Sequence, residues 1–279
     1  MTDEHVRRAA DTYAAAADHY TRYALSFWDR FGSATVSRLP LAPGAFVLDL
    51  CCGAGASAIP AASAVGPAGR VLGIDAAAPM LERARAKAAR QGLANIEFRC
   101  DDATRTGLAD GSFDAVLCVF GVFFAPDMVA FMREMWRMVR PGGVLAVTTW
   151  GPGLFEPANS HFWRCVGHVE PSLVKAFSPW DQITTPAALA DLFSRADILD
   201  PAVEAADGQH RLEHPDDFWD IVLGSGYRAT VNALSPAQGD RLRADLLAEL
   251  RSREITTVQT DTVYGTATRP APASPIAGS

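Results

Sequence analysis

Two acids and two glycines early in the chain have the types and spacing of a ligand-binding loop. The segment VLDLCCGAG (47–55) is typical of an apolar strand that carries Asp49 near its end and turns through Gly53 and Gly55. Glycines let a backbone approach a ligand closely, and a following helix offers unpaired N–H groups. A second apolar strand ends at Asp75, twenty positions after Gly55, close to the spacing at which α/β proteins place an acid on a ribose. The pattern predicts a site for a nucleoside-containing cofactor.

Two kinds of cofactor compete for this loop. Gly53, Gly55 and Ala58 match the G-x-G-x-x-G/A pattern of dinucleotide binders, which is weak by itself. A dinucleotide would bring a doubly charged pyrophosphate close to Asp49, whose carboxylate would repel it. S-adenosylmethionine (SAM) carries a sulfonium, an ammonium and one carboxylate, so an acid beside the turn is tolerated or attractive. The charges favour SAM, and an NAD-type oxidoreductase is the alternative.

The loop needs a sheet to position it, and the hydrophobic pattern predicts one. Apolar strands are expected at 45–50, 70–74, 95–100, 113–119 and 144–150, with helices at 56–65, 79–90 and 126–139 between them. Apolar strands separated by helices predict a parallel sheet that is covered on both faces and binds its ligand at the carboxyl ends of the strands. The signal weakens beyond this point, where we expect a helix at 185–196, a strand at 203–211, a helix at 235–254 and a strand at 263–268.

Three regions are expected along the chain. Residues 1–40 carry rings every three or four positions, which indicates a helix or helix pair that packs on the sheet or forms a lid over a substrate pocket. Residues 41–269 form the main domain, in which 151–260 elaborate the substrate side. Residues 270–279 are expected to be a disordered tail.

Composition excludes several functional classes. Hydrophobic residues make up 49% and charged residues 20%, and no apolar stretch approaches the roughly 20 residues of a membrane span. The start of the chain lacks the apolar core of a signal peptide, so we expect a cytoplasmic location. A formal charge of −7 without a basic stripe argues against nucleic-acid binding. Five cysteines without C-x-x-C spacing indicate reduced thiols and no metal site. The oligomeric state stays open, a homodimer included.

Five segments in order, VLDLCCGAG, VLGIDAAAPMLERAR, IEFRCDDAT, DGSFDAVLCV and MVRPGGVLAVTTW, resemble the class I SAM-dependent methyltransferases. The chain is most similar to the branch that includes the ubiquinone and menaquinone C-methyltransferases, in which a Cys-Cys-Gly turn also occurs. The resemblance is strong over residues 40–150 and implies a Rossmann-like, doubly wound, mostly parallel seven-stranded sheet with an N-terminal helical lid and a C-terminal antiparallel strand. It implies methyl transfer from SAM to an O, N or C atom of a small, aromatic or apolar metabolite. A SAM-binding module without activity stays an alternative.

The resemblance also implies roles for individual residues. Asp49 and the backbone of Gly53 and Gly55 would flank the methionine part of SAM, and Asp75 would hold both ribose hydroxyls. The adenine would contact Met80, Asp102 and the N–H of Ala103, and the methionyl end would contact Cys118 and Val119.

Two positions depart from the family pattern. Cys51, which we include among the cofactor-binding residues, stands where many members have their first glycine, so an ordinary backbone conformation is expected there. Thr106 and Gly107 replace a common Leu-Pro, which predicts a looser loop beside the adenine.

Methyl transfer from a sulfonium needs alignment in a dry pocket more than acid or base catalysis. The candidate pocket residues are aromatic: Tyr13, Tyr20, Phe120, Phe124, Trp150 and Trp163. We expect their pocket between the N-terminal helix and the aromatic segment after Trp150. A hydroxyl acceptor would call for a general base, for which His19 and His161 are the candidates. A phenolate or a stabilised carbanion would need none.

Overall fold

Seven strands form the central sheet of the computed structural model, which describes residues 4–175 and 177–271. Their order is β3-β2-β1-β4-β5-β9-β6. Strands β1 to β5 are parallel, and β9 runs antiparallel to its neighbours β5 and β6. The sheet is built from β1 (Phe46–Leu50), β2 (Arg70–Asp75), β3 (Ile96–Cys100), β4 (Phe113–Val119), β5 (Val139–Trp150), β6 (Ala202–Ala206) and β9 (Thr262–Thr268). The predicted fold class, including the late antiparallel strand, is confirmed.

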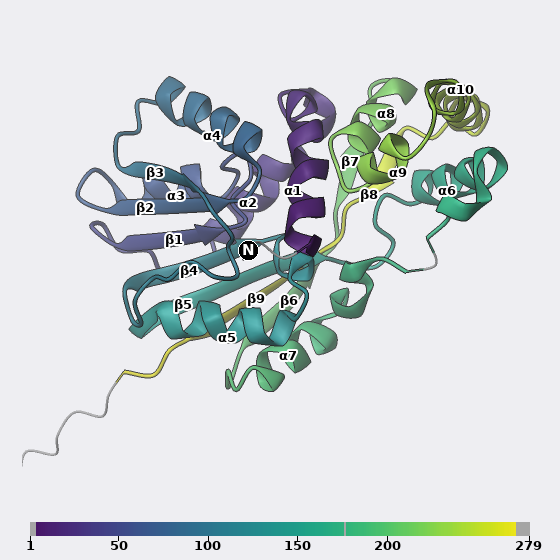
Figure 1. The fold of residues 1–279 in the computed structure, drawn as a ribbon. Coiled ribbons are helices and arrows are strands. Elements are labelled where there is room, and N and C mark those ends of the chain that lie inside the picture. Colours follow the sequence, from purple (N-terminus) through teal and green to yellow (C-terminus); the bar gives the residue numbers. More distant parts are fainter. Residues whose placement is uncertain (1–3, 176, 272–279) are drawn as a thin grey trace, which may run out of the picture.

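Helices cover both faces of the sheet because successive strand residues point to opposite sides. Val47 and Leu117 face the helices α2 (Phe27–Val36), α3 (Ala58–Val65) and α4 (Ala78–Arg90). Leu48 and Val116 face the other side, where α5 (Met128–Met138) and α7 (Pro186–Arg195) pack. All four side chains are buried. This sandwich leaves the carboxyl ends of the strands as the open edge of the sheet (Figure 1).

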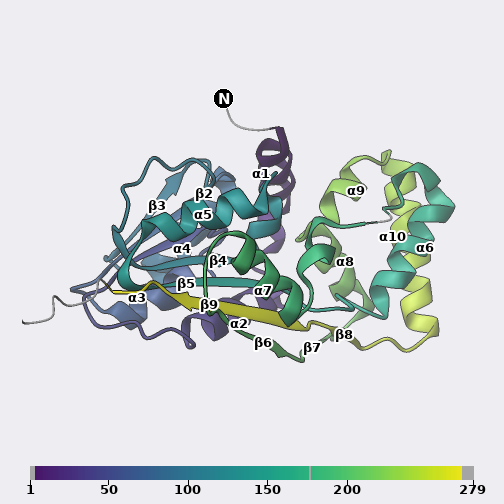
Figure 2. The same cartoon turned by 90° about the horizontal axis from the view of Figure 1, so that it is seen from below.

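A second group of elements lies beyond that edge, and Figures 1 and 2 show it as a separate lobe. It contains α6 (Ala158–Val169), α8 (Pro215–Leu223), α9 (Arg228–Asn232), α10 (Pro236–Ser252) and the two-stranded sheet of β7 (Gln209–Arg211) and β8 (Thr257–Gln259). Helix α10 packs on α6 and α8. The predicted strand at 203–211 is therefore two strands, of which β6 joins the central sheet and β7 joins the lobe. Residues 151–260 therefore contribute elements both to the central sheet with its helices and to the lobe.

The N-terminal helix α1 (Glu4–Ala16) stands between the sheet and the lobe and contacts α4 on one side and α9 on the other (Figure 1). Short 3-10 helices complete the chain: η1 (Ala17–His19), η2 (Tyr23–Leu25), η3 (Val122–Phe124), η4 (Pro171–Leu173) and η5 (Pro179–Ile183). Across the ranges described above, no helix combines the length and apolar character needed to cross a bilayer. Most of the predicted disordered tail, residues 272–279, lies outside the described residues.

Candidate functional site

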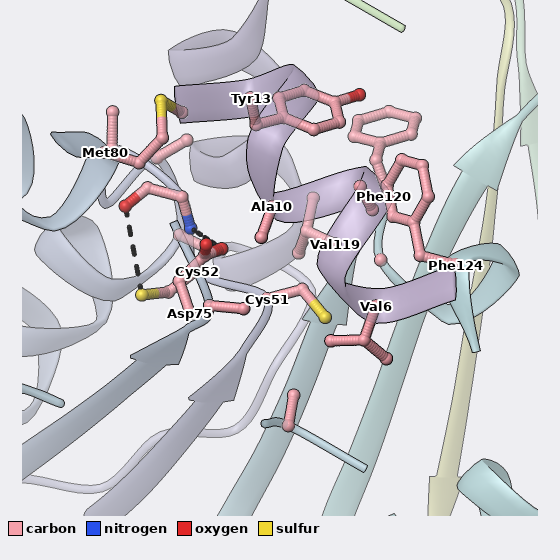
Figure 3. A pocket seen from close by; sticks show the side chains of 18 of the residues that line it. Val6, Ala10, Tyr13, Cys51, Cys52, Asp75, Met80, Val119, Phe120 and Phe124 are labelled. Carbon is pink, nitrogen blue, oxygen red and sulfur yellow. Dashed lines mark hydrogen bonds between the residues drawn. The ribbon is translucent and has the colours of Figure 1, made fainter. Parts of the chain in front are cut away.

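A cavity of about 120 Å³ opens at the carboxyl ends of β1, β2 and β4 and is roofed by α1 (Figure 3). One water molecule needs roughly 10–15 Å³ of such space, so side chains do not fill this cavity. Seven of the predicted cofactor-binding residues line it: Cys51, Gly53, Asp75, Met80, Asp102, Ala103 and Val119. The acids at the ends of β2 and β3 therefore face one common space.

The turn after β1 differs from the prediction at Cys51. We expected an ordinary backbone, but Cys51 has φ +56°, in the left-handed region that usually favours glycine. Gly121 makes room for this conformation, because a Cβ at Gly121 would lie 2.5 Å from the Cβ of Cys51. Gly53 follows with φ +50°. The chain thus makes a left-handed turn at Cys51 and places a thiol beside the cavity there.

Asp75 organises the floor of the cavity. Its carboxylate accepts the N–H of Gly53 through Oδ2 and the N–H of Ala77 through Oδ1, both at 2.8 Å. Burial raises the pKa of Asp75, and these N–H groups oppose the increase. Each carboxylate oxygen can accept more than one hydrogen bond, so Asp75 keeps capacity for donors inside the cavity.

Asp49 lies beneath the cavity and is fully buried, with Oδ2 accepting the Ser57 hydroxyl at 2.7 Å. Its Oδ1 has no hydrogen-bond partner in the described chain. Burial raises the pKa of Asp49 to about 7, and the charge of Asp75 adds to the increase. Ser57 lines the cavity, whereas Asp49 is not among the lining residues. Asp49 therefore does not line the cavity itself, and it contacts the cavity lining through its hydrogen bond with Ser57.

Two other predicted residues support the cavity from outside its lining. A Cβ at Gly55, where φ is +81°, would approach Ile59 to 3.0 Å, so this glycine serves helix packing. Cys118 is buried beside Cys51, and its Sγ would lie 2.8 Å from a Cβ at Gly121. Neither residue is among those that line the cavity.

The loop after β3 holds Asp102 at the cavity wall. Its Oδ1 accepts the backbone N–H of Thr104 at 2.9 Å and the Thr104 hydroxyl at 2.6 Å. The Thr106 hydroxyl accepts the N–H of Leu108, and Arg99 donates to the Thr106 carbonyl. The segment predicted to be looser than in the family therefore carries a hydrogen-bond network of its own.

Four of the six predicted aromatic residues line the cavity: Tyr13, Tyr20, Phe120 and Phe124. Trp150 is stacked on Phe120, with ring centroids 4.1 Å apart, and lines a separate cavity of only about 20 Å³. Trp163 lines a groove farther out. The space predicted between α1 and the aromatic segment after Trp150 contains this small cavity and a groove of about 810 Å³, which is lined by Tyr13 on one side and by Phe177 and Trp180 on the other. Its use as a substrate pocket stays a prediction.

The two histidines proposed as bases lie elsewhere. His19 Nδ1 is 3.4 Å from the Asp220 carboxylate on α8, and burial lowers the pKa of His19 despite that neighbour. His161 on α6 contacts Arg164 at 2.6 Å and Glu249 on α10 at 3.2 Å. Neither lines any of the cavities found along the described chain. The structure does not bring a histidine to the site.

Sequence reasoning missed many lining residues. Most are small, apart from Trp28 and Phe131, and they come from α1, from α2, from the turn after β1 and from the segments that follow the other strands: Val6, Ala9, Ala10, Trp28, Cys52, Ala54, Ala56, Ser57, Ala76, Thr104, Gly121, Ala125 and Phe131. Gly121, two residues after β4, was detectable as a small residue at a strand end. Val6, Ala9 and Ala10 on α1 have no sequence feature that would mark them as cavity-lining residues. Over 4–175 and 177–271, no three His, Cys, Asp or Glu side chains gather as a metal site.

Comparisons with known proteins agree with this geometry. A family model described as "Methyltransferase domain" matches residues 47–143. The demethylmenaquinone methyltransferase of Lactococcus lactis subsp. lactis (strain IL1403) is 31% identical over 185 residues, which cover 64% of this chain and 72% of that protein. The nocamycin O-methyltransferase of Saccharothrix syringae is 28% identical over 223 residues, which cover 75% and 78%.

A solved structure shares the fold. Phosphoethanolamine N-methyltransferase 2 from Haemonchus contortus, determined with phosphomonomethylethanolamine and S-adenosylhomocysteine, has a TM-score of 0.58 at 16% identity, covering 96% of this chain and 61% of that chain. The identity to the Lactococcus protein over most of its length decides the family. The chain belongs to the class I SAM-dependent methyltransferases, in the branch of the quinone C-methyltransferases, and is an enzyme that uses SAM as its cofactor.

Proposed function

We propose that the cavity beneath α1 holds SAM and that Asp75 binds the ribose. The observation that carries this proposal is the Asp75 carboxylate, which lines the cavity with hydrogen-bonding capacity to spare. Two ribose hydroxyls would satisfy it, and charge-assisted bonds of this kind contribute roughly 1.5–3 kcal/mol each. The cavity lining therefore fits the group.

The remaining lining residues suit the other parts of the cofactor. Met80 is buried at the cavity wall and offers an apolar, polarisable surface to an adenine face. Asp102 has its Oδ1 bonded to Thr104, which leaves Oδ2 to accept the adenine amino group. Val119 and Cys51 would flank the methionyl end. SAM supplies a methyl group on a positively charged sulfur, and the residues around it need only bind, orient and exclude water.

We also propose an aromatic or apolar acceptor. Tyr13, Tyr20, Trp28, Phe120 and Phe124 line the same cavity as the cofactor-binding residues, and Tyr13 meets Phe124 edge to face with centroids 5.4 Å apart. Figure 3 places Tyr13 on α1 above the floor that Asp75 and Cys51 form. Helix α1 would act as the lid that keeps water from the reacting atoms. Relatives named as demethylmenaquinone and nocamycin O-methyltransferases support a small-molecule acceptor.

The residues that line the cofactor cavity suit a methyl transfer that depends on alignment of the two reactants and needs no general base. A phenolate or stabilised carbanion held at about 3–3.5 Å from the methyl carbon needs no base, and no histidine lines the cavity in the part of the chain described. Incubation with labelled SAM and a panel of phenols, hydroquinones and β-diketones tests this. Transfer of label to an ionisable carbon or oxygen acid supports the proposal, and transfer only to amines contradicts it.

A further inference from the structure

Two grooves flank a short segment beyond the cofactor cavity. The first, of about 810 Å³, lies against α1 and the start of α5, and the second, of about 400 Å³, lies beside α6. Lys175, Phe177, Ser178 and Trp180 line both grooves. These four residues, which we call the partition, therefore present side chains to both spaces.

The first groove borders the cofactor cavity directly. Ala9, Tyr13, Phe124 and Ala125 line both the cavity and this groove. The edge-to-face pair of Tyr13 and Phe124 thus forms the wall between them, and both rings are visible in Figure 3. The groove that the partition lines and the cofactor cavity therefore share Tyr13 and Phe124 as a common wall.

The partition offers an aromatic surface. Phe177 is 56% exposed, and it lines both grooves together with Trp180. Trp180 stands edge-on to Phe123 of η3 at 5.6 Å and also lines the small inner cavity near Trp150. A flat, apolar ligand body would cover surface that is now open to water.

Lys175 adds a positive charge to this surface. The residue is exposed, and partial desolvation of its ammonium lowers its pKa. It forms no ion pair with any residue the structure describes, whereas the chain's other lysine, Lys87, pairs with Asp29. The carboxylate of a bound ligand would therefore meet Lys175 without displacing an acid of the protein.

The acids that line the grooves already accept hydrogen bonds from neighbouring backbone or side-chain groups. Asp127 caps α5 by accepting the N–H of Ala130 at 2.9 Å, and Asp181 accepts the N–H of Ser178 at 2.7 Å. Glu156 accepts from Asn159 and Ser160. The first groove is also lined by two further cations, Arg8 and Arg195. Arg8 pairs with Glu4 and Arg195 pairs with Asp191, so Lys175 is the cation among these three without an ion pair to any residue that the structure describes.

We propose that the acceptor is an aromatic compound that carries a carboxylate, with its ring against Phe177 and Trp180 and its carboxylate on Lys175. The reacting end extends past Tyr13 into the cofactor cavity. This inference rests on the proposed function and specifies the substrate class of the same site.

The test compares 6-hydroxy-2-naphthoic acid, whose hydroxyl and carboxylate lie at opposite ends of the ring system, with its methyl ester, titrated by calorimetry into protein saturated with S-adenosylhomocysteine. The two probes share the ring and the hydroxyl and differ in charge. An ion pair with an exposed lysine contributes about 0.2–1 kcal/mol, so the acid should bind about 1.5- to 5-fold tighter than the ester. Lys175→Met should remove the preference, and Lys175→Arg should retain most of it.

Matched variants separate the contributions. Lys87→Met changes the other lysine and should leave the acid-to-ester ratio at the wild-type value. Phe177→Ala should weaken both probes by the same factor. Equal affinity of acid and ester for the wild type, absence of acid binding, or a preference that survives Lys175→Met would each overturn the inference. Failure of S-adenosylhomocysteine itself to bind would instead overturn the proposed function, so the two failures are distinguishable.

Discussion

Replacing Asp49 by Asn should change how the stability of the protein depends on pH. Asp49 is fully buried at the end of β1, and burial raises its pKa from the ordinary 3.8 to about 7. Well below pH 3.8 the Asp49 carboxyl is protonated in both the folded and the unfolded state, so its burial adds no pH dependence to the free energy of unfolding. As the pH rises towards 7, the unfolded chain ionises while the folded protein keeps its proton. Folding stability from this group is therefore lost over that interval.

The magnitude follows from the width of that interval. Each pH unit over which only the unfolded chain is ionised removes about 1.4 kcal/mol. Between pH 5 and pH 8 the wild type should therefore lose about 2–3 kcal/mol that Asp49→Asn does not lose, because the amide cannot ionise. The amide oxygen can still accept the Ser57 hydroxyl, so the fold should persist.

Urea unfolding of both proteins at pH 5, 6, 7 and 8 measures this difference. Asp114→Asn is the matched control. Although burial opposes it, hydrogen bonds from the Phe46 N–H and from Arg140 lower the pKa of Asp114. Stability from Asp114 is then fully present above pH 3.8 and is lost only in stronger acid, so its effect should stay constant from pH 5 to 8. A constant Asp49→Asn effect over the same range would refute the assignment of a buried, protonated Asp49.

Three further variants test the site. Asp75→Asn should weaken S-adenosylhomocysteine binding about 10- to 100-fold in calorimetry, because the ribose loses charged hydrogen bonds; unchanged affinity would contradict this. Gly121→Ala should destabilise the protein by about 1–3 kcal/mol in chemical denaturation, because its Cβ would overlap that of Cys51. In the control Gly239→Ala, within α10, nothing lies near the new methyl group, and stability should rise by up to about 1 kcal/mol. His161→Ala should leave kcat/KM near the wild-type value, and a loss of about 10²-fold or more would indicate a base after all.

The sheet and the ends of its strands were predictable because local patterns determine them. Continuous apolar runs gave β1 to β5 within a few residues, and the acids at the ends of β2 and β3 pointed to one edge. The early start of β5 was missed because Val139 and the Pro-Gly-Gly segment after it look like a turn in sequence, yet Val139 pairs with Phe113 across a register irregularity.

The features that were missed depend on contacts distant in sequence. The left-handed conformation of Cys51 is permitted by Gly121, which lies seventy positions later. Trp150 and Phe120 stack because β5 and β4 are neighbours, and Trp150 is not among the residues that line the cofactor cavity. His161 was an attractive base by residue type alone, but packing of α6 on α10 directs it to Glu249.

A crystal structure of the protein with S-adenosylhomocysteine would test the central claim most directly. The adenosine should occupy the cavity beneath α1, with both ribose hydroxyls within hydrogen-bonding distance of the Asp75 carboxylate and the adenine against Met80. A complex in which the nucleoside lies outside this cavity, or in which Asp75 makes no contact with the ribose, would contradict it.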